Sequence, residues 1–302
     1  MSRTNSSPAD SKYWLWINDQ LVIFEGGLKR GPSPSGTYYD PVDIAPYLTK
    51  GSNTIAILLW HFGKDGFSHI NSGKAALLFE AIAPGLEIVS DASWQCALYE
   101  AYQNTEAPFP NYRMPESNIR FDARQAITNW NRTSFEGSLP GAVCVGKAGK
   151  APFGELVERP IPQWKNSGLL SYVSVRESLK GDTLFCRLPY NAQITPYLKV
   201  EAEAGKTIHI RMDNYEGGSE RNVRAEYITH EGEQEYESYG WMNGHEVYYI
   251  IPEGVKVLDV KYRETGYNTD LAGSFHCDDP FYDELWQRSA RTLYITMRDN
   301  YM

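Results

Sequence analysis

The chain has 302 residues, of which 42% are hydrophobic and 22% are charged, and its formal net charge is −9 at pH 7. This length predicts two domains, each large enough to form a hydrophobic core without disulfides or a structural metal. The negative charge argues against nucleic acid and anionic membranes as partners, because both would repel an acidic chain. The longest apolar run, residues 55–60, is far too short to span a bilayer.

The four cysteines and the N-terminal residues leave the cellular compartment open. No two cysteines form a Cys-x-x-Cys pair, and in a chain of this length such spacing favours buried thiols over a disulfide framework or a zinc site. Residues 1–12 contain no apolar segment typical of an export signal. We expect a cytoplasmic protein if this is the natural start, or a periplasmic or secreted one if a leader was removed. The cysteines are Cys96, Cys144, Cys186 and Cys277.

The first half of the chain has the pattern of a β-sandwich. Residues 13–24 contain two short β-rich runs around Asn18-Asp19, which is typical of a hairpin. A long loop rich in Gly, Pro and Ser follows at residues 26–41, and residues 51–63 then contain a turn and a strand that is buried on both faces. We predict a β-sandwich over residues 13–150.

A proline-rich junction separates this region from a second β series. Residues 147–168 show no usable period, and their prolines oppose regular strand pairing, so we predict a linker at 151–170. Residues 198–212 alternate cleanly between apolar and polar side chains around a turn at Gly205-Lys206. The sequence therefore predicts an all-β architecture, with a second β-sandwich at 171–275.

A helix is expected at the C-terminal end, over residues 278–302. Asp278 or Asp279 can cap its first N–H groups, and Pro280 fits the first turn because it has no N–H to lose. No other helix upstream could cover its apolar stripe, and no stop signal follows it. We therefore expect a chain cut within this helix, with a stripe that is exposed or covered by a second copy through self-association. The stripe consists of Phe281, Leu285, Trp286, Leu293, Tyr294 and Met297.

Motifs for catalysis or metal binding are absent from the sequence. There is no nucleophile elbow, P-loop, Rossmann glycine pattern or His-Glu-x-x-His. Residues 213–224 do not match a calcium loop, because Arg224 stands where the closing Glu belongs. Glycosidases need two carboxylates on opposite sides of a bond, and spacing nominates no such pair. We predict no catalytic residue, no metal and no cofactor.

Aromatic residues provide the candidates for sugar binding. An aromatic face can cover the C–H groups of a sugar while neighbouring polar side chains bind its hydroxyls. The alternative, which the residue types favour, is that these rings pack against a neighbouring layer. The candidates are Trp60 with His61 and Trp241 with His245, and Trp14 with Trp16 on a separate strand.

Several stretches resemble one known family. Residues 188–215, 223–267 and 273–302 resemble the region just before, and at the start of, the catalytic domain in bacterial α-L-rhamnosidases of glycoside hydrolase family 78. Residues 12–27 and 42–63 look like the galactose-binding-like sandwich of that family. The resemblance implies that the second sandwich is jelly-roll-like. It also implies a catalytic (α/α)6 barrel that hydrolyses with inversion and uses two acidic residues.

The resemblance also predicts what this chain does. It places the helix from Pro280 at the start of the barrel and an acidic Asp-Cys-Pro-x-Arg-Asp/Glu type of motif after Met302, so no catalytic residue of the family falls on a position here. We expect an accessory, non-catalytic portion of an enzyme that acts on rhamnose-containing glycans. The alternatives are a free-standing carbohydrate-binding protein whose helix mediates assembly, and a structural module without glycan specificity.

Overall fold

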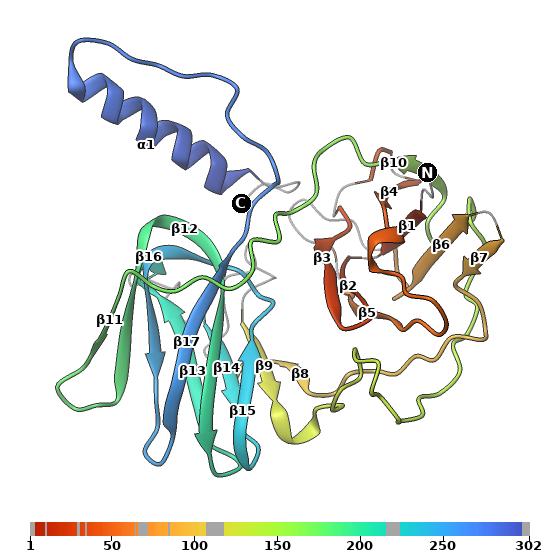
Figure 1. Cartoon of the computed structure of the whole chain (residues 1–302), viewed down its shortest axis with the longest axis horizontal. Helices are drawn as coiled ribbons and strands as arrows, with labels where there is room; N and C mark the ends of the chain where they lie inside the picture. Colours follow the sequence, from red (N-terminus) through yellow and green to blue (C-terminus); the bar gives the residue numbers. More distant parts are fainter. Residues whose placement is uncertain are drawn as a thin grey trace. The chain divides into compact units, whose positions relative to one another are not determined.

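The computed structural model describes residues 4–9, 11–28, 31–33, 35–63, 65, 72–83, 85–106, 118–215 and 224–297. The regular structure of the described chain is mainly β-strand, with one α-helix at its C-terminal end, as the sequence predicts (Figure 1). It divides into two compact units. Unit 1 comprises residues up to 98 together with 127–164, and unit 2 comprises residues 99–126 together with 165–297.

The described part of unit 1 contains a five-stranded and a three-stranded sheet. The five-stranded sheet has the order β10-β4-β1-β6-β7 and the three-stranded sheet has the order β3-β2-β5. All pairs are antiparallel except β10 with β4. The strands are β1 Thr4–Ala9, β2 Lys12–Ile17, β3 Gln20–Gly26, β4 Gly36–Val42, β5 Ile55–Trp60, β6 Leu77–Ala83, β7 Leu86–Val89 and β10 Glu155–Glu158.

The predicted hairpin at the start of unit 1 is confirmed. β2 and β3 are joined by Asn18 (φ 47°) and Asp19 (φ 69°), the left-handed conformation that a two-residue hairpin turn requires. Every residue of β2 is buried. The adjoining core cluster combines Tyr13, Leu15 and Ile17 of β2 with Phe79 of β6, so it lies between the two sheets.

A buried ion pair attaches residues 155–164 to unit 1, within the range that the sequence assigns to a linker. β10 pairs in parallel with β4. Directly after β10, Arg159 Nη1 lies 2.7 Å from Asp40 Oδ1, and both side chains are buried. Tyr13 Oη donates to the other oxygen of Asp40 at 2.7 Å. The proline-rich stretch is therefore held by the ladder to β4 and a buried charged contact rather than by a periodic apolar face.

The described part of unit 2 is built on a nine-stranded sheet. Its main path is β11-β12-β16-β13-β14-β9-β8, and β15 and β17 both pair with β12. The core cluster draws on most of these strands and includes Leu198, Ile210 and Val247. The strands are β8 Tyr102–Asn104, β9 Ile119–Asp122, β11 Ser174–Glu177, β12 Thr183–Ala202, β13 Thr207–Met212, β14 Ala225–Ile228, β15 Gly232–Glu237, β16 Met242–Ile250 and β17 Lys256–Glu264.

The long strand β12 changes neighbours halfway along its length. Its first half pairs with β11 and β16, and its second half pairs with β15 and β17. The register shifts between Arg187 and Ala192, and Pro189 lies inside this irregular stretch, where the ladder does not need its missing N–H. Tyr190 and Asn191 therefore lie outside the regular ladder, at the end of unit 2 that adjoins the helix.

β8 and β9 belong to unit 2, although they fall in the range that the sequence assigns to the first sandwich. β9 pairs in parallel with β14. Arg120 of β9 donates to Glu226 of β14 at 2.8 Å, and the two residues are 106 positions apart in the chain. This long-range charged contact fixes the excursion of residues 99–126 to the second sheet.

The C-terminal helix α1 runs from Pro280 to Thr296, and its predicted start is confirmed. The Asp279 carboxylate accepts from the Phe281 N–H at 3.0 Å, and Pro280 occupies the first turn. Short 3-10 helices occur at η1 Ala45–Tyr47, η2 Ala123–Gln125 and η3 Asp213–Tyr215. Within the described residues, no helix is both long enough and apolar enough to cross a membrane.

Candidate functional site

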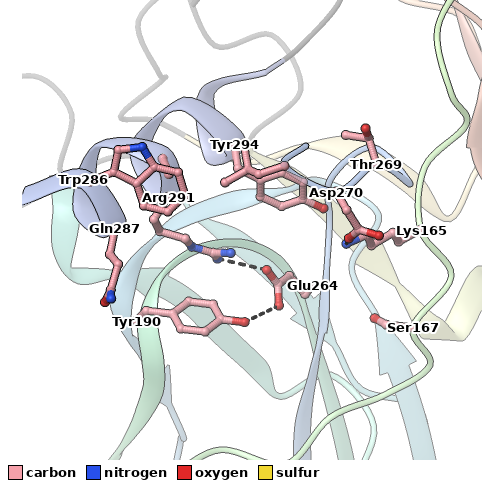
Figure 2. A pocket seen from close by; sticks show the side chains of 12 residues that line it. Lys165, Ser167, Tyr190, Glu264, Thr269, Asp270, Trp286, Gln287, Arg291 and Tyr294 are labelled. Atoms are coloured by element: carbon pink, nitrogen blue, oxygen red, sulfur yellow. Dashed lines mark hydrogen bonds and ion pairs between the residues drawn. The ribbon is translucent and has the colours of Figure 1, made fainter. Parts of the chain in front are cut away.

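Unit 2 contains a pocket of about 510 Å³ between α1, the irregular middle stretch of β12 and the end of β17 (Figure 2). One face of α1 provides Trp286, Arg291 and Tyr294, which are spaced so that a helix presents them on one side. Tyr190 comes from the irregular stretch of β12, and Glu264 is the last residue of β17. The pocket therefore depends on the docking of the helix against these two strands.

Arg291 connects α1 to both strands. Its Nη2 lies 2.9 Å from Glu264 Oε1, and its Nε donates to the Asn191 carbonyl at 2.9 Å. Its guanidinium carbon lies 3.8 Å from the centroid of the Tyr190 ring, a cation–π arrangement. We call Tyr190, Asn191, Glu264 and Arg291 the Arg291 hub.

Tyr190 completes the hub as a neutral donor. Its hydroxyl donates to Glu264 Oε2 at 3.0 Å, as Figure 2 shows. Burial and the neighbouring Glu264 carboxylate raise the pKa of the Tyr190 phenol to about 12, so it keeps its proton at neutral pH. Both oxygens of Glu264 are therefore occupied, one by a guanidinium and one by a phenol. The β12–β17 register, which pairs Ile194 with Glu264, holds this carboxylate beside the irregular stretch.

Tyr294 forms a second contact between the helix and unit 2. Its hydroxyl donates to the Tyr267 carbonyl at 3.0 Å, and Lys165 Nζ lies 5.1 Å from the centroid of its ring. This approach requires a glycine at position 266, because a Cβ built there would lie only 2.5 Å from Tyr294 Oη. Gly266 therefore leaves the space in which the last turns of α1 rest.

The formal charges in the pocket lining balance. The two cations are Lys165 and Arg291, and the two anions are Glu264 and Asp270. Lys165 Nζ lies 4.0 Å from Asp270 Oδ1, and the Asp270 side chain is fully exposed at the rim. Gln287 adds an amide that can both donate and accept. This combination suits the binding of a polar, uncharged molecule better than proton transfer, because Glu264 is committed to Arg291 and Asp270 is solvated.

The described residues show no arrangement suited to a metal. No group of three or more His, Cys, Asp or Glu side chains among them could hold a metal ion. The buried thiol Cys186 has a pKa raised to about 12, chiefly by burial, so it stays protonated and unreactive at neutral pH.

Two of the sequence-predicted binding residues, Trp60 and His61, lie in unit 1. Trp60 ends β5 and stacks on Trp14 with ring centroids 6.4 Å apart. Lys12 Nζ lies 4.7 Å from the centroid of the Trp60 ring, and Lys12 is itself buried beside Glu25. Trp60 therefore takes part in a packed aromatic and charged cluster, and His61 follows it as a half-buried residue.

The other two, Trp241 and His245, lie in unit 2 but do not line its pocket. Trp241 is only 5% exposed and directly precedes β16. His245 is exposed on β16, where its N–H donates to Asp213 Oδ1 at 2.8 Å and its Nδ1 lies 3.6 Å from Asp213 Oδ2. A sugar-binding role for these four residues stays a prediction.

Sequence reasoning missed Tyr190, Glu264 and Arg291 as members of one site. Trp286 and Tyr294 were identified only as part of the apolar stripe. One local signal was present, since Arg291 is a charged residue between Trp286 and Tyr294 on a face that otherwise calls for apolar side chains. A polar residue on such a face needs a buried partner, and that partner is Glu264.

Comparisons with known proteins found similarity in structure alone. No family model and no curated protein sequence matches the chain. The fold matches a GH78 family rhamnosidase of Bacillus sp. GL1 with a TM-score of 0.83 and 15% identity, over 100% of this chain and 55% of that one. It matches an α-L-rhamnosidase from Dictyoglumus thermophilum with a TM-score of 0.67 and 19% identity, over 94% and 33%.

A Streptomyces avermitilis α-L-rhamnosidase, solved in complex with L-rhamnose, gives a TM-score of 0.67 at 18% identity. That match covers 100% of this chain and 30% of the other. This chain thus spans little more than half, or about a third, of the structures that it matches. The chain has the fold of the N-terminal portion of α-L-rhamnosidases of glycoside hydrolase family 78.

Proposed function

We propose that the chain is the accessory, non-catalytic portion of an α-L-rhamnosidase-like glycoside hydrolase that acts on rhamnose-containing glycans. The observation that supports this most strongly is a fold likeness that extends over the whole chain, both units and α1 included, at a TM-score of 0.83. In this proposal unit 1 is a galactose-binding-like sandwich and unit 2 is a jelly-roll-like sandwich. The helix α1 is then the first helix of a catalytic helical barrel.

The state of the carboxylates supports a non-catalytic role. An inverting glycosidase needs a general acid whose pKa is raised, facing a base about 6.5–9.5 Å away. Among the described residues, the buried carboxylates are instead each paired with a cation: Asp40, Asp122 and Glu226 with arginine, and Glu25 with Lys12. The two arginines beside Glu226 lower its pKa in spite of burial, which is the opposite of what a general acid requires.

The second candidate is a free-standing carbohydrate-binding or assembly module without hydrolase activity. The pocket in unit 2 and the exposed apolar side chains of α1, among them Phe281, Leu285 and Leu293, favour it. The reading frame after the Met302 codon distinguishes the two candidates. Continuation into a helix-rich segment with an acidic motif supports the accessory role, whereas a stop codon at that point contradicts it and supports the free-standing module.

A further inference from the structure

We propose that the pocket beside α1 binds one neutral sugar unit, with the indole of Trp286 as its stacking platform. The inference deepens the proposed function, and it rests on that function for the choice of L-rhamnose as one of the sugars to test. The class of ligand follows from the pocket itself, through its aromatic wall, its balanced charge and its mixed hydrogen-bonding groups.

Trp286 is the aromatic ring of the pocket that remains available. The Tyr190 ring is covered by the Arg291 guanidinium, and the Tyr294 ring lies beneath Lys165. Trp286 is half-buried on the pocket side of α1 and, among the described residues, has no ring or cation stacked on it. A half-buried indole can cover the C–H face of a pyranose, and its area is removed from water when it does so.

The charges select a neutral ligand. Lys165 and Arg291 are balanced by Asp270 and Glu264, so the lining attracts neither an anion nor a cation strongly. Gln287 lies beside Trp286, whereas Lys165 and Asp270 line the opposite end of the pocket, beyond Tyr294 (Figure 2). The Gln287 amide can both donate and accept hydrogen bonds, as a sugar hydroxyl does, whereas a hydrocarbon beside Trp286 would leave this amide without a partner.

The Arg291 hub forms the pocket before any ligand arrives. Its guanidinium, carboxylate and phenol satisfy one another, which holds α1 against β12 and β17. A binding site that is already formed avoids the entropy cost of ordering side chains on binding. The volume of about 510 Å³ also falls within the usual range of small-molecule sites.

Saturation-transfer difference NMR on the whole chain tests this proposal. The sugars are L-rhamnose, D-mannose, D-galactose and D-glucose, with D-glucuronate as the acidic comparison. We expect at least one neutral sugar to receive saturation at its ring C–H protons, and D-glucuronate to bind no more strongly. Trp286→Ala should weaken that binding about tenfold through loss of the stacked ring. Leu285→Ala is the matched control, because Leu285 is an exposed neighbour on the same helix and does not line the pocket.

Two further variants keep the test decisive if Trp286→Ala disturbs the helix. Asp270 and Gln287 are exposed, so Asp270→Asn and Gln287→Ala leave the fold intact. Gln287→Ala, beside Trp286, should weaken binding several-fold, whereas Asp270→Asn, at the opposite end of the pocket, should leave it nearly unchanged. Failure of the folded chain to bind any of the four neutral sugars overturns the proposal. Unchanged binding by Trp286→Ala and Gln287→Ala, or a preference for D-glucuronate, overturns it as well. None of these results measures hydrolysis, so the accessory role is tested separately by the absence of rhamnoside turnover.

Discussion

Glu226 is a buried carboxylate whose charge is balanced by Arg120 of β9 and by Arg224, which directly precedes β14. Its side chain is 1% exposed, with Arg120 Nη2 and Arg224 Nη2 each 2.7 Å from a carboxylate oxygen. Burial alone would raise its pKa, but the hydrogen bonds from the two arginines outweigh burial and lower the pKa below its ordinary value of 4.5. Glu226 thus connects β9 to β14, and through β9 it holds the described part of residues 99–126 on the sheet of unit 2.

Glu226→Gln should lower the free energy of unfolding by about 3 kcal/mol, because two guanidinium groups would lose their buried anion. Urea denaturation followed by circular dichroism measures this change. The matched control is Glu201→Gln, since Glu201 forms an exposed pair with Lys256 and should contribute no more than about 0.5 kcal/mol. Equal effects of the two substitutions would show that Glu226 does not anchor β9.

Acid should destabilise the chain over the range set by His209, Glu226 and Asp122. Burial lowers the pKa of His209 below 6.5, with Glu226 opposing it, and Arg124 lowers that of Asp122 below 3.8. At each of these groups the unfolded chain binds protons more readily than the folded chain, so stability falls as the pH decreases. The loss begins below pH 6.5 at His209 and deepens below pH 4.5 at Glu226.

Melting temperatures between about pH 7 and pH 3 measure this dependence, because the contributions of Glu226 and Asp122 are lost below pH 4.5 and pH 3.8. The melting temperature should fall throughout, and Glu226→Gln should flatten its most acidic part because that variant has no carboxylate to protonate. A melting temperature that stays constant or rises as acid is added would contradict the assigned pKa directions.

One face of α1 packs against the strands of unit 2, and the opposite face is exposed to solvent. Trp286, Arg291 and Tyr294 line the pocket, whereas Phe281 and Leu293 are 61% and 57% exposed. The sequence predicted the start of α1 because capping is local, but it predicted that no part of this chain covers the stripe. The partners Tyr190, in the irregular middle of β12, and Glu264, at the end of β17, lie where no helical period reveals them. Self-association through the exposed face stays a prediction.

Arg291→Ala should loosen the contact of α1 with β12 and β17. The substitution leaves Glu264 with the Tyr190 hydroxyl as its remaining partner in the hub and removes the bond to the Asn191 carbonyl. We expect the amides of residues 284–296 to exchange hydrogen about tenfold faster, because loss of the half-buried Arg291–Glu264 pair permits local opening. Hydrogen exchange with mass spectrometry measures this rate.

Arg288→Ala is the control from the same helix. Arg288 is 78% exposed and pairs with Glu284 one turn away, so its loss removes an interaction of only about 0.3–0.5 kcal/mol. Its effect on exchange should be small. Equal acceleration in both variants would show that the Arg291 hub does not hold the helix.

Whether the other elements could be predicted also depends on whether nearby or distant residues determine them. The β2–β3 hairpin could be predicted, because Asn18-Asp19 between two β-rich runs determines it locally. β10 could not, because the prolines on either side of it, Pro152 and Pro160, oppose regular pairing and its anchor is the Arg159–Asp40 pair, 119 positions apart. The same holds for β9, whose parallel pairing with β14 leaves no pattern in either segment.

For the whole molecule, the period-two patterns predicted the strand content, and the order of strand blocks predicted the likeness to α-L-rhamnosidases that the solved structures show. The pocket could not be predicted from the sequence, because its lining combines side chains from residue 165, β12, the end of β17 and α1. Such a site depends on the folded arrangement of segments that each look structural when taken alone.

In the role proposed above, this chain provides accessory β-structure and no catalytic carboxylate pair. Release of 4-nitrophenol from 4-nitrophenyl α-L-rhamnopyranoside checks this role, with the GH78 rhamnosidase of Bacillus sp. GL1 as the positive control. We expect no release by the purified chain above the buffer rate, because the loss of an acid–base pair forfeits orders of magnitude in rate. Release at a rate comparable with the control, and proportional to the concentration of the chain, would contradict it and place the catalytic carboxylates within these 302 residues.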